Sequence, residues 1–183
     1  MERRKKASVP MASLVGYTNA GKSTLFNALS NAKVEAEDQL FSTLDPVTRR
    51  VRLPSGQEIL LTDTVGFIQK LSPTVVAAFR ATLEELRQSD ILLHVIDVTH
   101  SKVAEQTEVV EDTLADLDLL NKPRILVLNK MDLLAEDTRE TDLSLLPGSA
   151  TLDNVMVSGA KRWNLHSLLQ QIESELIGIY QPS

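Results

Sequence analysis

Short apolar runs alternate with amphipathic stretches along the chain, a pattern typical of strands and helices in alternation. The runs 91–96 and 125–128 are apolar apart from His94, as expected for strands covered on both faces. Residues 10–15 and 155–157 form two further short apolar segments. Because longer segments separate these runs, we expect the strands to pair in parallel.

One hairpin interrupts this alternation. Residues 49–53 and 58–62 flank Pro54-Ser55-Gly56-Gln57, a combination typical of a turn. The hairpin predicts one antiparallel strand beside the parallel ones.

Apolar residues recur at helical spacing in four other segments. They are 23–29, a segment that begins at Ser72 and Pro73, 103–120, and 165–177 with Leu176 and Ile177 on its inner face. The fold class predicted is α/β, a mostly parallel six-stranded sheet with one antiparallel strand and helices on both faces.

Composition narrows the class of protein. The 183 residues suffice for one ordinary domain, and 43% hydrophobic with 24% charged residues is typical of a globular chain. A net charge of −6 argues against broad affinity for nucleic acid, although a local basic patch is compatible with it. The absence of cysteine excludes disulfides and thiol catalysis and suits a reducing cytoplasm. No apolar run approaches the ~18 residues of a membrane span.

A complete GxxxxGKS phosphate-binding loop follows the first predicted strand. In this motif backbone N–H groups surround a phosphate, the Lys22 ammonium reaches the β- and γ-phosphates, and the Ser23 hydroxyl ligates Mg²⁺. The strand, loop and helix order around it is the expected context. The residues predicted to bind the phosphates are Gly16, Tyr17, Thr18, Asn19, Ala20, Gly21, Lys22, Ser23 and Thr24.

A DxxG motif follows the second hairpin strand. It comprises Asp63, Thr64, Val65 and Gly66. The Asp63 carboxylate can hold Mg²⁺ through a water molecule, and the Gly66 N–H can contact the γ-phosphate.

Two later motifs predict the choice of base. The Asp132 carboxylate can accept hydrogen bonds from guanine N1–H and N2–H₂, a donor pair that adenine lacks. Asn129 can brace the loop and contact N7, and the Lys130 stem can cover the ring. The residues predicted to contact the base are Asn129, Lys130, Met131 and Asp132, together with Ser158, Gly159 and Ala160, which would offer a backbone N–H to O6.

The chain resembles the HflX family of ribosome-associated GTPases. The resemblance rests on the motifs above, on 41–50 with Thr43-Leu44-Asp45-Pro46, and on 79–85, and it spans about 12–180. It implies a P-loop NTPase fold, with a GTPase domain at 11–181 and a basic linker or boundary at 1–10. Family members usually have Ser-Ala at 158–159, and they carry an N-terminal domain that we expect to be missing here.

The resemblance also implies a first switch loop. Its GTP-binding residues are Phe41, Ser42, Thr43, Leu44 and Asp45. The implied metal ligands are Ser23, Thr43 and, through water, Asp63. The implied catalytic residues are Lys22, Thr43 and Asn19, with Asn19 able to coordinate K⁺ between the phosphates as a second cation beside Mg²⁺.

These features predict a Mg²⁺-dependent GTPase that switches between GTP and GDP conformations. Phe67 occupies the place of the glutamine that orients water in Ras-like enzymes, so we expect slow turnover alone. The resemblance implies stimulation by the large ribosomal subunit. We also expect a monomer and a cytoplasmic location. A nucleotide-gated binding module with negligible hydrolysis and an ATP-using P-loop enzyme remain alternatives.

Two other residues are expected in the interior. His94 lies within an apolar strand and is interpreted as a core histidine with its hydrogen bonds satisfied, rather than a base. Trp163 is expected to pack against the last helix, with a docking surface as the alternative.

Overall fold

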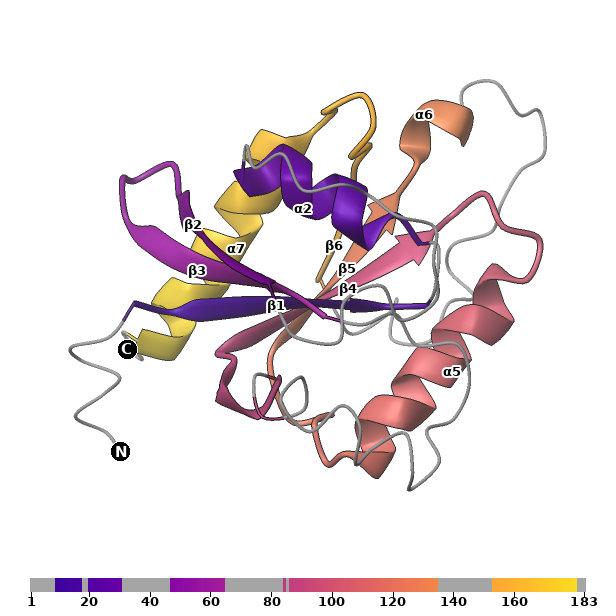
Figure 1. The fold of residues 1–183 in the computed structure, drawn as a ribbon, viewed down its shortest axis with the longest axis horizontal. Coiled ribbons are helices and arrows are strands. Elements are labelled where there is room, and N and C mark those ends of the chain that lie inside the picture. The colour runs from indigo at the N-terminus through magenta and orange to yellow at the C-terminus, as the bar shows by residue number, and fades with distance from the viewer. Residues whose placement is uncertain are drawn as a thin grey trace.

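The computed structural model describes residues 9–17, 20–30, 47–64, 84, 86–134 and 153–180. These residues form a six-stranded sheet in the order β2-β3-β1-β4-β5-β6 (Figure 1). The strands are β1 (Met11–Gly16), β2 (Val47–Arg52), β3 (Glu58–Asp63), β4 (Ile91–Asp97), β5 (Arg124–Asn129) and β6 (Asp153–Met156). Strand β2 runs antiparallel to β3, and all other neighbours are parallel. The predicted fold class is confirmed.

Helices cover both faces of this sheet (Figure 1). They are α2 (Lys22–Ser30), α5 (Val103–Asp116), the short α6 (Met131–Leu134) and α7 (Leu165–Tyr180). Helices α2 and α7 lie on one face, and α5 lies on the other (Figure 1). Within the described part of the chain, no helix has the length and apolar composition needed to cross a membrane.

Side chains that alternate along β1 separate the two halves of the core. Leu14 packs into the cluster that contains Phe26 of α2 and Ile172 of α7. Its neighbour Val15 points to the opposite cluster, which contains Leu114 of α5. Because successive side chains of a strand point to opposite faces, a central strand covered on both faces is apolar at most positions. The exception in β1 is the buried Ser13, whose hydroxyl shares a hydrogen bond with the hydroxyl of Ser89.

The carboxyl ends of the parallel strands meet at one edge of the sheet. Strand β1 pairs with β3 on one side and with β4 on the other, so the order of strands reverses beside it. Ligands of open α/β sheets bind at such a reversal. Gly16, Asp63, Asp97 and Asn129 end β1, β3, β4 and β5 at this edge.

The helix expected over 103–120 is shorter, because α5 ends at Asp116. The N–H of Leu119 donates to the carbonyl of Leu114 at 2.8 Å, and the N–H of Asp118 donates to the carbonyl of Ala115 at 3.1 Å. Together these two hydrogen bonds form a Schellman motif. Asp118 occupies the left-handed position at φ 60°, and Leu120 is 43% exposed. The predicted length was wrong because this position holds aspartate instead of the glycine that usually signals a helix end.

Two apolar residues are more exposed than expected. Ile177 on α7 is 52% exposed, because it lies about 100° around the helix from the buried Leu176. Trp163 is 44% exposed, and its backbone forms an antiparallel bridge with Ser158.

Several sequence predictions concern positions outside the described residues. They are Thr18, Asn19, Phe41 to Asp45, Val65 to Leu71 with Gly66 and Phe67, and the helix expected after Ser72 and Pro73.

Candidate functional site

Lys22 and Ser23 open α2 directly beside the end of β3. Lys22 is only 8% exposed. Its ammonium donates to the Thr64 carbonyl at 2.8 Å and lies 3.4 Å from Oδ1 of Asp63. The Ser23 hydroxyl donates to the other Asp63 oxygen at 3.1 Å. The structure therefore brings the phosphate-loop lysine, its serine and the DxxG aspartate into one cluster.

The donor set of this cluster fits Mg²⁺. Magnesium prefers hard oxygen ligands, and the Ser23 hydroxyl and the Asp63 carboxylate both supply them. Among the residues that the structure describes, no group of three or more His, Cys, Asp or Glu side chains could hold a metal. Magnesium here would take its remaining ligands from phosphate oxygens and water, as it commonly does.

Two glycines of the phosphate loop have no room for a side chain. A Cβ on Gly16 would lie 2.6 Å from the Val95 carbonyl oxygen. Gly21 has φ +91°, and a Cβ there would lie 2.4 Å from Nδ2 of Asn129. The spacing of the motif therefore reflects close packing of the loop against β4 and β5 as well as room for a phosphate.

Asn129 joins the phosphate loop to the loop that follows β6. Its Nδ2 donates to the Ala20 carbonyl at 2.9 Å, and its Oδ1 accepts from the Gly159 N–H at 3.0 Å. The residue is 2% exposed. Both the NH₂ group and the oxygen of this amide form hydrogen bonds within the protein. These two bonds are the bracing contact that the sequence led us to expect.

Gly159 approaches α2 closely. A Cβ at this position would lie 3.0 Å from the Cα of Leu25. An alanine at this position would need a shift of α2 by a few tenths of an ångström. The glycine therefore matches the local packing of this chain.

Asp132 is oriented by a hydroxyl that the sequence argument did not use. The Ser158 hydroxyl donates to Oδ1 of Asp132 at 2.7 Å and accepts from the Lys161 N–H at 3.0 Å. The Met131 N–H donates to the Val157 carbonyl at 3.0 Å and ties the start of α6 to the end of β6. From the sequence, only a backbone contact is expected of Ser158.

Asp97 is a second residue that the sequence argument missed. It ends β4, is 8% exposed and accepts a 3.0 Å hydrogen bond from the Lys130 ammonium. Burial would raise the pKa of Asp97, but hydrogen bonds from Thr99 and Lys130 outweigh it and hold that pKa below its usual value. Its position in the sequence could have identified it. Asp97 is an acidic residue at the end of an apolar strand, at the edge of the sheet where the other motifs lie.

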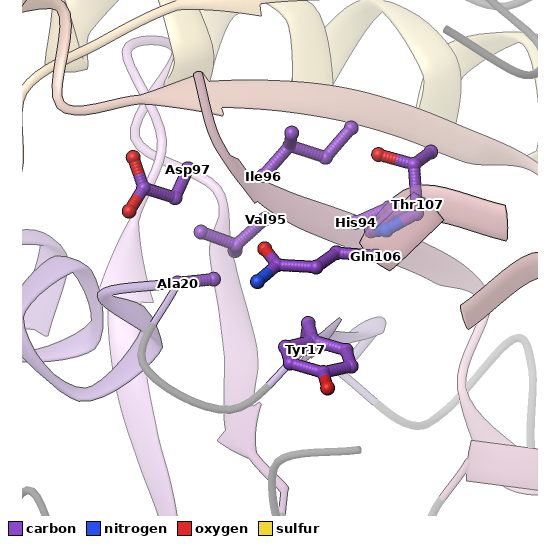
Figure 2. Close-up of a pocket in the computed structure, with 8 residues that line it drawn as sticks. All are labelled: Tyr17, Ala20, His94, Val95, Ile96, Asp97, Gln106 and Thr107. Atoms are coloured by element: carbon purple, nitrogen blue, oxygen red, sulfur yellow. The ribbon is translucent and has the colours of Figure 1, made fainter. Parts of the chain in front are cut away.

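A small cavity lies behind the phosphate loop, between β4 and α5. Tyr17 and Ala20 line it from the loop, His94 from β4, and Gln106 and Thr107 from α5 (Figure 2). Its volume is about 10 Å³, room for about one water molecule.

His94 belongs to a buried ionic cluster rather than to the site. It is 1% exposed, and its Nδ1 lies 3.6 Å from Glu111, which forms an ion pair with Arg124. Burial lowers the pKa of the imidazole. His94 is therefore a core residue, as the sequence predicted. The prediction that its hydrogen bonds are all satisfied was wrong, because Nδ1 has no hydrogen-bond partner within the described part of the chain.

Comparison with known proteins agrees with this geometry. The sequence family described as 50S ribosome-binding GTPase matches residues 11–130. The GTPase HflX of Caldanaerobacter subterraneus subsp. tengcongensis is 49% identical over 175 residues, which cover 96% of this chain and 39% of the relative. The GTPase HflX of Escherichia coli strain K12 is 53% identical over 135 residues, which cover 74% of this chain and 32% of the relative.

A solved structure extends the comparison to three dimensions. It is a GTP-binding protein from the hyperthermophilic archaeon Sulfolobus solfataricus in complex with GDP, with a TM-score of 0.74 and 30% identity. The match covers 97% of this chain and 56% of that one. The chain thus spans less than half the length of the curated relatives and just over half of this neighbour. With the phosphate loop and the base-side residues gathered at one edge of the sheet, these matches show that the chain belongs to the family described as 50S ribosome-binding GTPase and is a partial, HflX-like GTPase domain.

Proposed function

We propose that this chain is a Mg²⁺-dependent switch domain that binds GTP and hydrolyses it to GDP and phosphate. The observation that carries the proposal is Asn129, which bonds both to the phosphate loop and to the loop after β6. Through this side chain the phosphate end and the base end of the site are held at a fixed separation. Residues 11–181 form the GTPase domain in this proposal, and 1–10 form a basic linker.

The described residues suggest how the phosphates are held. The Lys22 ammonium is surrounded by oxygen atoms of Asp63 and Thr64, and anionic phosphate oxygens can compete for it. Bound Mg²⁺ would neutralise part of the triphosphate charge, held by Ser23, by Thr43 and, through water, by Asp63. The helix α2 begins at the same place and adds the positive end of its dipole.

Hydrolysis would proceed by attack of water on the γ-phosphorus, in line with the leaving oxygen of GDP. The bond between the γ-phosphorus and the bridging oxygen breaks, and Lys22 offsets the charge that develops on the phosphoryl oxygens. Phe67 follows Gly66 and cannot orient the water by a hydrogen bond. We therefore propose slow turnover in isolation, acceleration by the large ribosomal subunit and, by association with ribosomes, a cytoplasmic location.

Nucleotide binding and single-turnover hydrolysis test this proposal. The chain should bind GDP and GTP and exclude ATP, and isolated large subunits should accelerate phosphate release. Equal affinity for ATP would overturn guanine selection. GTP binding without hydrolysis, with or without subunits, would instead favour a nucleotide-gated binding module.

A further inference from the structure

Asp97 is held in a single orientation by the turn that follows β4. One carboxylate oxygen, Oδ1, accepts from the Thr99 N–H at 2.9 Å and from the Thr99 hydroxyl at 2.6 Å. These two bonds fix the rotamer, so the other oxygen, Oδ2, has a fixed direction. It accepts from the Lys130 ammonium at 3.0 Å.

Sheet pairing places the two residues within reach of each other. In the register of β4 and β5, Asp97 lies opposite Asn129, the residue immediately before Lys130. The N–H of Val98 also donates to the Asn129 carbonyl at 3.3 Å, which extends the pairing beyond the strand ends. The contact between Asp97 and Lys130 therefore follows from the parallel pairing, although 33 positions separate them.

The Lys130 side chain passes beside the phosphate loop on its way to Asp97. The backbone of Lys130 has φ 69°, a conformation that is uncommon for residues other than glycine. A Cβ on Gly21 would lie 3.6 Å from Cε of Lys130, so the lysine stem runs in contact distance of the loop. Figure 2 shows Asp97 on the same side of the cavity as Ala20 of that loop. The stem thus spans from the base-side motif, past the phosphate loop, to the end of β4.

We propose that Asp97 is a positioning residue for nucleotide binding, which holds the Lys130 stem as a rigid wall of the site where base and ribose lie. This inference rests on the proposed binding of guanine nucleotides. Lys130 lies between Asn129, which braces the loop, and Asp132, which reads the base, so a mobile Lys130 would loosen the face that the ring packs against. A side chain that is already ordered loses less conformational entropy when the ligand binds.

The test is a double-mutant cycle on GDP affinity, measured by calorimetry and by the rate of GDP dissociation. Asp97→Asn keeps the shape and removes the charge, and Lys130→Met keeps the stem and removes the ammonium. Each single variant should weaken GDP binding by about tenfold, the lower end of the effect of one hydrogen bond to a charged group, mostly through faster dissociation. The double variant should be no weaker than Lys130→Met alone.

Asp90→Asn is the matched control. Asp90 also binds the backbone at a strand end, since its Oδ2 accepts from the Met11 N–H at 2.9 Å. It immediately precedes β4 and therefore lies at the edge of the sheet opposite to Asp97. GDP affinity should be unchanged in this variant. Thr99→Val, which removes only the hydroxyl bond that aims Asp97, should weaken GDP binding by a smaller factor and gives a second route if Asp97→Asn does not fold.

Four outcomes separate the inference from the proposed function. If the unmodified chain does not bind GDP, the proposed function fails. If it binds GDP and Asp97→Asn binds equally well, the positioning role fails. The role also fails if the losses in Asp97→Asn and Lys130→Met add in the double variant, or if Asp90→Asn weakens GDP binding as much as Asp97→Asn does.

Discussion

The Ser158 hydroxyl donates a 2.7 Å hydrogen bond to Oδ1 of Asp132, across 26 positions of the sequence. The same hydroxyl accepts from the Lys161 N–H, so its direction is fixed by the backbone of its own loop. One oxygen of the carboxylate is therefore anchored. The loop after β6 thus has a side-chain role in addition to the backbone role that the sequence suggested.

Ser158→Ala should weaken GDP binding by roughly tenfold. A hydrogen bond to a charged group contributes about 1.5–3 kcal/mol, and the lower value corresponds to that factor. Titration calorimetry measures the effect. Ser55→Ala is the control, because Ser55 lies in the exposed hairpin turn and should leave the affinity unchanged. Wild-type affinity in Ser158→Ala would show that Asp132 needs no anchor.

Asp132→Asn should shift the preference from guanine to xanthine nucleotides. The amide offers an N–H where the carboxylate accepted one, and xanthine presents an oxygen in place of the guanine amino group. Competition between GDP and XDP for the same site measures the exchange. An unchanged order of affinities would contradict the assignment of Asp132 to the base edge.

Two glycine substitutions should change stability in opposite directions. Gly16→Ala should lower the free energy of unfolding by about 1–3 kcal/mol, because its Cβ would meet the Val95 carbonyl oxygen at 2.6 Å. Gly178→Ala on α7 has nothing within 4 Å of the new Cβ and should raise it by about 0.5–1 kcal/mol. Urea titration compares the two variants with the unmodified chain. Similar shifts in both would contradict the packing argument.

Glu175 should make the protein less stable as pH rises toward neutrality. A hydrogen bond with Asp153 and partial burial raise the pKa of Glu175 to about 7 from its usual 4.5. A carboxyl whose pKa is raised in the folded state binds more protons when folded, so the stabilisation present below pH 4.5 is lost as pH rises through 7.

Glu175→Gln should flatten this dependence between pH 5 and 8, with higher stability at pH 8 than the unmodified chain. Melting temperature against pH measures it. Glu108→Gln, at an exposed position of α5, is the control and should leave the profile unchanged. A profile that Glu175→Gln does not alter would rule out the carboxyl pair as its cause.

Hydrolysis of GTP should be faster in KCl than in NaCl at equal ionic strength. The prediction follows from Asn19, which can coordinate a potassium ion between the phosphates and so add positive charge to the transition state. Single-turnover rates in the two salts measure the difference, and Asn19→Ala should abolish it. Equal rates in both salts with the unmodified chain would dismiss the role of K⁺.

Local patterns predicted most of the secondary structure in the part of the chain that the structure describes. Strands such as 91–96 were recognisable because a strand buried on both faces is apolar at most positions, with His94 the exception in this run. The phosphate loop was recognisable because its two glycines, its lysine and its serine stand at the fixed spacing of a known motif within one short segment, 16–23. The end of α5 was missed because Asp118 adopts a conformation that is more typical of glycine.

Contacts between strand ends depended on the tertiary structure. Nothing local to Asp97 indicates Lys130 as its partner, because only the pairing of β4 with β5 brings their ends together. Likewise, the Ser158 hydroxyl meets Asp132 only once β6 lies beside β5. By itself the sequence determined which chemical groups this protein carries and which local elements hold them. The order of strands in the sheet decided which of those groups meet, since side chains far apart in the chain become neighbours only when their strands pair.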